Sequence, residues 1–170
     1  MIDSVLTTAV TVSDMERSLA FYRDLLGFRV AAELPPPAER ARWDAYHQQV
    51  CGIDGAVIRV VYLEAPDTQT ALELIEYTTP KRPPQPPSDV DRGGTVIIAL
   101  AVADSDSAIA RMRDAGVETL SDPVPYVTDD GVSSKTTYLR DPDGTLLCFF
   151  EIIESPHSLT DNNPMEKPND

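Results

Sequence analysis

The sequence predicts an α+β fold in which one structural module occurs twice in tandem. Residues 12–24, VSDMERSLAFYRD, correspond to residues 102–114, VADSDSAIARMRD, at a constant offset of 90 residues. A second pair, LELIE at 72–76 and LCFFE at 147–151, corresponds at an offset of 75 residues. In each half a strand pattern comes first, a helix pattern follows, and further strand patterns close the half. The fold class follows from this repeated order.

The first strand of each half shows the alternation of a sheet with two different faces. We expect a strand at residues 4–12, with Leu6, Val10 and Val12 on one face and Thr7 on the other. In the corresponding strand of the second half, the same alternation is expected to place Ile97 and the residue that follows it on opposite faces.

Helices are expected directly after these two strands. Asp14 and Asp104 are suited to cap their N-termini, and Ser13 with Glu16 offers a competing capping box in the first half. A helical apolar stripe follows, formed by Leu19, Tyr22 and Leu26. Glycine, which tolerates a left-handed backbone, is expected to end both helices, at Gly27 and Gly116.

The remaining strands and the connections complete the plan. Strands are expected at AVIRVVYLEA and ALELIEY in the first half, and at KTTYLR and TLLCFFEII in the second, with a tight turn at RDPDGT. We predict one domain at 1–154, made of modules at 2–79 and 95–154 joined by a proline-rich extended linker at 80–94. Residues 155–170 are polar and are expected to be a disordered tail.

Composition limits the partners of the chain. The net charge of −14 disfavours nucleic acid and anionic membranes, and no apolar run is long enough to span a bilayer. The N-terminus lacks the pattern of a secretory signal, and two cysteines, Cys51 and Cys148, form no disulfide framework. These features predict a cytoplasmic protein.

Four segments together resemble a known family. LTTAVTVSDMERSLAFYRDLLGF, LELIEY, IIALAVADSDSAIARMRDAGV and YLRDPDGTLLCFFE are similar, in order and spacing, to the vicinal oxygen chelate superfamily. That superfamily includes glyoxalases, methylmalonyl-CoA epimerases, extradiol dioxygenases, and fosfomycin and bleomycin resistance proteins. The resemblance covers residues 2–153. It implies two βαβββ modules that form a curved mixed sheet around a central cup, and a homodimer.

The resemblance also implies a metal site with one ligand on each of four strands. The family's motif places these positions at Thr7, Glu73, Ile97 and Cys148. Isoleucine has no donor atom, a threonine hydroxyl is a weak ligand, and a catalytic metal commonly keeps three protein ligands. We therefore expect a cup without metal or other cofactor. Glu151 follows Cys148 by three residues, so its side chain is expected on the opposite face of the strand. Only a β-bulge would turn it toward the cup.

The same positions supply candidates for binding and chemistry. Glu73 is the one ionisable group expected to face the cup at these positions, either as a general base or as an inert hydrogen-bonded carboxylate. Cys148 is interpreted as a packing residue of the binding wall, because no adjacent base would activate its thiol. Thr7 and Ile97 are expected to shape the cavity.

The insertion at 33–56 carries the other candidates. Trp43, Tyr46, His47 and Val50 recur at helical spacing, so a short helix could cover the mouth of the cup. Its aromatic rings either stack on a flat ligand or pack under a loop. His47 is the second catalytic candidate, as an acid or base near neutral pH, with a structural role as the alternative.

Three residues complete the predicted substrate-binding set. Arg59 is a candidate partner for an anionic ligand or for Glu73, Tyr126 is expected on a loop at the rim of the cup, and Phe150 lies in the last strand.

Three functions remain open at this point. The first is a metal-independent enzyme of natural-product metabolism that isomerises, eliminates from or cyclises a small organic molecule, with Glu73 accepting a proton. The second is a protein that sequesters a drug or toxic metabolite, similar to bleomycin resistance proteins. The third is a glyoxalase-like metal enzyme that uses Glu73, Cys148 and Glu151 as non-standard ligands.

Overall fold

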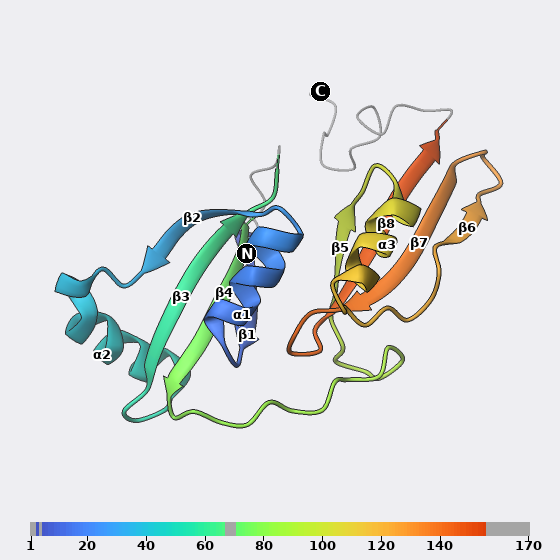
Figure 1. Cartoon of the computed structure of the whole chain (residues 1–170). Coiled ribbons are helices and arrows are strands. Elements are labelled where there is room, and N and C mark those ends of the chain that lie inside the picture. The colour runs from blue at the N-terminus through green and yellow to red at the C-terminus, as the bar shows by residue number, and fades with distance from the viewer. Residues whose placement is uncertain (1–2, 4, 67–70, 156–170) are drawn as a thin grey trace. The chain divides into compact units, whose positions relative to one another are not determined.

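The computed structural model describes residues 3, 5–66 and 71–155, and its chain forms two compact units (Figure 1). One unit comprises the residues up to Ser88 together with Asp141–Thr145, and the other comprises Asp89–Arg140 and the residues from Leu146 onward. Each contains one βαβββ module with a four-stranded mixed sheet, which confirms the predicted fold class. The predicted tail lies outside the described residues from position 156 on.

The first unit has the strand order β1-β4-β3-β2, with β1 parallel to β4. The strand predicted at 4–12 begins only at Thr7, and β2 was not predicted. Its elements are β1 (Thr7–Val12), α1 (Met15–Leu19), a π-helical continuation η1 (Ala20–Leu25), β2 (Arg29–Leu34), a 3-10 turn η2 (Pro37–Glu39), α2 (Arg40–Cys51), β3 (Val57–Glu64) and β4 (Ala71–Thr79).

The second unit repeats this plan with the order β5-β8-β7-β6, and β5 is parallel to β8. The proline-rich residues 80–87 that precede it form neither helix nor strand, as predicted. No described helix has the length and apolar character needed to cross a bilayer. The elements are β5 (Ile97–Ala101), α3 (Ser105–Asp114), β6 (Val124–Val127), β7 (Ser133–Arg140) and β8 (Leu146–Glu154).

Both helices begin and end as their sequences predict. The Asp14 side chain accepts a hydrogen bond from the Arg17 N–H at 2.9 Å, and Asp104 accepts one from the Ser107 N–H at 3.0 Å. These bonds satisfy N–H groups that the first turn of a helix leaves without a partner. α1 contacts β4, and α3 contacts β7 and β8 (Figure 1). The backbone is left-handed after each helix, with φ of 86° at Gly27 and 78° at Gly116.

The first helix differs from the expected α-helix in its second half. The Leu26 N–H donates to the carbonyl of Phe21 at 2.9 Å, five residues back, so this turn is wider than an α-turn. As a result the neighbouring residues Phe21 and Tyr22 are both buried, whereas Leu26 is only half-buried. Of the predicted apolar stripe, Leu19 and Tyr22 are confirmed as core residues and Leu26 is not.

The turn between β7 and β8 belongs to the first unit, although both of its strands belong to the second. Asp141 organises it by accepting hydrogen bonds from the N–H groups of Asp143 at 2.9 Å and Thr145 at 2.7 Å. Its other oxygen accepts from the Tyr22 hydroxyl at 2.9 Å. Burial raises the pKa of the Asp141 carboxyl although these donors oppose the rise, and burial with the nearby Asp141 charge raises the pKa of Tyr22.

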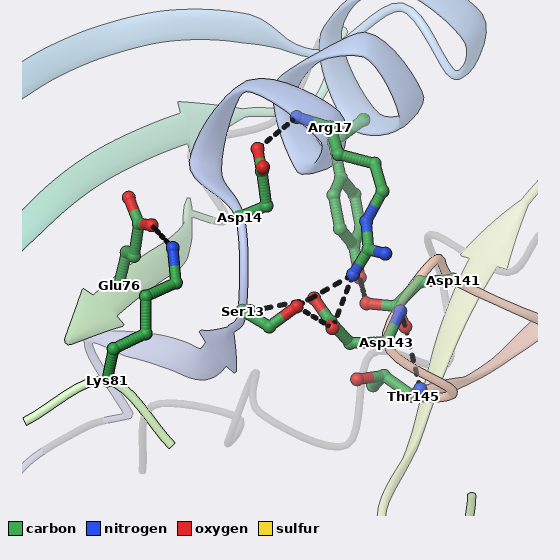
Figure 2. Close-up of polar contacts among 9 residues, drawn as sticks. Ser13, Asp14, Arg17, Glu76, Lys81, Asp141, Asp143 and Thr145 are labelled. Atoms are coloured by element: carbon green, nitrogen blue, oxygen red, sulfur yellow. Dashed lines mark hydrogen bonds and ion pairs between the residues drawn. The ribbon is translucent and has the colours of Figure 1, made fainter. Parts of the chain in front are cut away.

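The next acidic residue of the turn binds the start of α1. Asp143 accepts from both the N–H and the hydroxyl of Ser13, at 2.9 and 2.6 Å, and pairs with Arg17 at 2.6 Å (Figure 2). Ser13 is thereby engaged, so the competing capping-box prediction for it is wrong. Gly144 is required for two reasons: its φ is +89°, and a Cβ there would approach Pro87 to 2.7 Å.

A Tyr22→Phe variant tests how strongly this turn is held. We expect it to lower the free energy of unfolding at pH 7 by roughly 1.5–3 kcal/mol, because Asp141 loses a buried donor to its charged oxygen. Chemical denaturation measures this value. Tyr126→Phe is the matched control, since Tyr126 is 66% exposed, and it should change stability by less than about 0.5 kcal/mol. Equal effects of the two variants would contradict a stabilising role of the contact.

Candidate functional site

The pairing of β1 with β4 fixes which side chains share the open face of the first sheet. Ala9 lies opposite Glu73 in this parallel register, so Thr7, two residues earlier, lies on the same face as Glu73. Val10 and Val12 are buried on the other face. The predicted orientation of Thr7 is therefore confirmed. The assignment of Leu6 to the buried face is wrong, because Leu6 precedes the strand and is 85% exposed.

The second unit repeats this arrangement. Ala99 lies opposite Cys148, which places Ile97 and Phe150 on the same face as Cys148. Ile97 and Phe150 are each 37% exposed, whereas Cys148 is only 6% exposed. Tyr126 lies in β6 opposite Ser134, with its side chain largely exposed, rather than on a loop. This face is thus mainly apolar.

Glu76 and Glu151 lie on the opposite strand faces from Glu73 and Cys148, and both have partners there. Glu151 accepts hydrogen bonds from the N–H and hydroxyl of Ser105, at 2.9 and 2.6 Å, and these donors lower its pKa. Since Ser105 is the first residue of α3, Glu151 lies on the helix side of its sheet. Glu76 is buried and pairs with Lys81 at 3.3 Å (Figure 2). A ligand set containing Glu151 is therefore wrong.

The residues at the four family positions do not fit the metal ion that the resemblance implies. Thr7 offers a neutral hydroxyl and Ile97 offers no donor. Burial raises the pKa of the Cys148 thiol, which keeps it in the protonated form that binds metal poorly. Only Glu73 remains as a charged donor. Within residues 3, 5–66 and 71–155, no three His, Cys, Asp or Glu side chains gather where they could hold a metal ion.

Glu73 has a partner that the sequence did not indicate. Tyr62 of β3 lies directly opposite Glu73 of β4 in the antiparallel register, so the two side chains share the open face. Burial, followed by the charge of Glu73 and a hydrogen bond to its side chain, raises the pKa of Tyr62. The Tyr62 hydroxyl therefore stays protonated beside Glu73.

The predicted helix of the insertion reaches the same place. Tyr46 of α2 is near enough to Tyr62 to contribute electrostatically to its raised pKa. The rings of Trp43 and His47 lie 4.3 Å apart, and Tyr46 meets His47 edge-on at 4.8 Å. We call Trp43, Tyr46 and His47 the α2 aromatic cluster. The helix that carries the cluster contacts β3, the strand of Tyr62.

The helix is held by contacts with β3 and the residues around it. The Arg40 side chain donates to the Ile58 carbonyl at 2.8 Å, and that of Gln48 donates to the Ala56 carbonyl at 3.3 Å. The predicted helix face is correct for half-buried Trp43 and His47, but Val50 is 63% exposed and takes no part in packing. A ring nitrogen of His47, Nδ1, lies 3.1 Å from the Trp43 carbonyl.

Arg59 does not occupy its predicted position. It lies opposite Glu76, on the face away from Glu73, and pairs with Glu16 of α1 at 2.6 Å and with Glu33 at 2.7 Å. These two carboxylates raise the pKa of the guanidinium, the hydrogen bond to Glu33 being the largest cause. Arg59 therefore joins α1 to the sheet, and the prediction that it binds a ligand or Glu73 is wrong.

Comparison with known proteins identifies the family. A model described as the Glyoxalase/Bleomycin resistance protein/Dioxygenase superfamily matches residues 4–149. The chain belongs to this superfamily. Its predicted resemblance to vicinal oxygen chelate proteins is thus confirmed. No curated protein matches the sequence significantly.

Solved structures of the superfamily share the fold. A glyoxalase family protein from Bacillus cereus has a TM-score of 0.76 and 18% identity, over 91% of this chain and 97% of that one. Glyoxalase I of Leishmania major has a TM-score of 0.56 and 22% identity, over 88% and 87% of the chains. TnmS3, an antibiotic-binding protein from Streptomyces sp. CB03234, has a TM-score of 0.54 and 21% identity, over 89% and 97%.

The contact between Glu73 and Tyr62 can be tested by titration. We expect Glu73→Gln to lower the pKa of Tyr62 toward the ordinary tyrosine value, because the carboxylate charge and hydrogen bond that raise it are removed. Nuclear magnetic resonance of ring-labelled tyrosine follows the pKa, with Tyr62→Phe identifying the signal. Glu76→Gln, on the opposite face, should leave it unchanged. An unchanged Tyr62 pKa in Glu73→Gln would contradict the contact.

Proposed function

We propose that the protein binds a small organic molecule against the open face around Glu73 and transfers a proton without a metal ion. The observation that carries this proposal is the pairing of Glu73 with Tyr62. A carboxylate that lies opposite a neutral tyrosine and forms no ion pair among the described residues has acceptor capacity left for a substrate proton. The reaction class is an isomerisation, elimination or cyclisation that one proton acceptor can promote.

The donor set supports a mechanism that does not pass through a metal. Glyoxalase and epimerase chemistry normally needs a cation to stabilise an enediolate, and Thr7 and Ile97 stand where ligands for it would be. Here the Tyr62 O–H lies on the same face as Glu73 and could donate a hydrogen bond to developing negative charge on the substrate. His47 of the α2 aromatic cluster remains a proposed second acid or base.

Sequestration without reaction is the second candidate, and the aromatic and apolar side chains favour it. The α2 aromatic cluster offers rings for stacking, and Ile97 and Phe150 offer partly exposed apolar surface in the second unit. The similarity to TnmS3, which binds an antibiotic, supports the fold's suitability for this role. A homodimer and a cytoplasmic location also remain proposals.

Hydrogen–deuterium exchange separates the two candidates. Small carbonyl compounds with acidic C–H bonds are first screened for binding through the fluorescence of Trp43, the single tryptophan of the chain. Binders are then incubated in D₂O and followed by proton resonance. We expect exchange by the wild type and a rate roughly 10²–10⁴-fold lower in Glu73→Gln, because the proton acceptor is lost.

Glu76→Gln is the matched control for this experiment. It makes the same change in the same strand but on the opposite face, so it should exchange at the wild-type rate. Equal rates in wild type and Glu73→Gln would remove Glu73 from the mechanism. Binding without any exchange by the wild type would instead establish sequestration.

A further inference from the structure

The carboxylate of Glu73 has no cationic partner within the part of the chain that the structure describes. None of the ion pairs among these residues includes Glu73, and the group that interacts with it, the Tyr62 hydroxyl, is neutral. A ligand that supplies a positive charge would therefore gain an interaction that the protein leaves open.

Basic side chains on the strands and helix of this unit are engaged elsewhere. Arg59 is on the opposite face, Arg29 pairs with Glu64, and Arg40 binds Asp44 and a backbone carbonyl. None of these pairs would have to break for a cation to approach Glu73. The same arrangement disfavours an anionic ligand, since no basic group of these pairs adjoins Glu73 and the chain carries a net charge of −14.

Aromatic rings stand beside this carboxylate. Tyr62 is its cross-strand neighbour, and Tyr46 lies on α2, the helix that contacts the strand of Tyr62. Tyr46 is 58% exposed, so its ring is accessible. The face of a tyrosine or tryptophan ring attracts cations, and a planar cation also gains stacking contact. A carboxylate next to accessible aromatic rings is the combination that recognises ammonium-type groups.

We infer that the molecule bound at this site carries a cationic nitrogen in or beside a planar ring system, the nitrogen lying against Glu73 and the ring against Tyr46 and Tyr62. This inference rests on the proposed small-molecule function and names its ligand class. The positive charge of this ligand compensates Glu73 as a metal ion would, although the residues at the four family positions do not fit a metal ion.

Two probes of nearly equal shape test the inference. 1-Methylquinolinium carries a permanent positive charge, and quinoline is its neutral counterpart at pH 8. Each is titrated into the full-length protein, and quenching of Trp43 fluorescence gives the dissociation constant. We expect the cation to bind at least about tenfold more tightly than quinoline, and this preference to decrease as sodium chloride is raised.

Variants test whether the preference for the cation over quinoline arises at Glu73. Glu73→Gln should weaken binding of 1-methylquinolinium about tenfold and leave quinoline unchanged. Glu76→Gln removes the same single charge from the other face, so it should preserve the preference and thereby exclude an effect of net charge alone. Tyr46→Leu should weaken both probes, since both lose a ring contact. Circular dichroism confirms that each variant is folded.

Every outcome decides between defined alternatives. Equal affinity of the wild type for the two probes, or equal losses in Glu73→Gln and Glu76→Gln, would overturn the cationic ligand class. Glu73-dependent exchange of a neutral carbonyl compound would then still support the proposed proton transfer. Conversely, a Glu73-dependent preference for the cation without exchange of any compound would leave the ligand class standing and remove the catalysis.

Discussion

The whole arrangement depends on the parallel pairing of the first and last strands of each module. This pairing aligns Ala9 with Glu73 and Ala99 with Cys148, and strand alternation then assigns every neighbour to one of two faces. One face of each sheet is occupied by its helix, which takes the large apolar residues. The other face keeps the positions where the superfamily places metal ligands. A shift of one residue in either pairing would exchange the two faces.

Loss of the ligands changes the charge of the site more than its shape. When a metal is bound, its positive charge compensates a carboxylate such as Glu73. Without suitable donors at Thr7, Ile97 and Cys148, that compensation has to come from hydrogen bonds or from the ligand. Tyr62 lies opposite Glu73 as a neutral neighbour, and its aromatic ring favours a cation. We propose that this face therefore binds an organic molecule in place of a metal ion.

Much of this could be predicted because it is encoded locally or by repetition. Alternation gave the face of Thr7, the repeat gave that of Ile97, and helical spacing indicated α2. Tyr62 was missed because its pairing depends on the register of the β3–β4 hairpin, which no local turn signal specifies. The face of Arg59 was predicted incorrectly because β3 has buried residues on both faces. Its sequence is therefore an almost continuous apolar run, in which no alternation marks the face of each residue. The contact of Asp141 with Tyr22 joins residues 119 positions apart and leaves no local signal.

Metal content tests the central claim most directly. Wild-type protein and a Glu73→Gln variant are equilibrated with Zn²⁺, Ni²⁺ and Mn²⁺, desalted, and analysed by mass spectrometry of the elements. We predict substoichiometric metal in both proteins, because Thr7, Ile97 and Cys148 supply no ligand suited to a metal ion. One equivalent of metal in the wild type, lost in Glu73→Gln, would contradict the account.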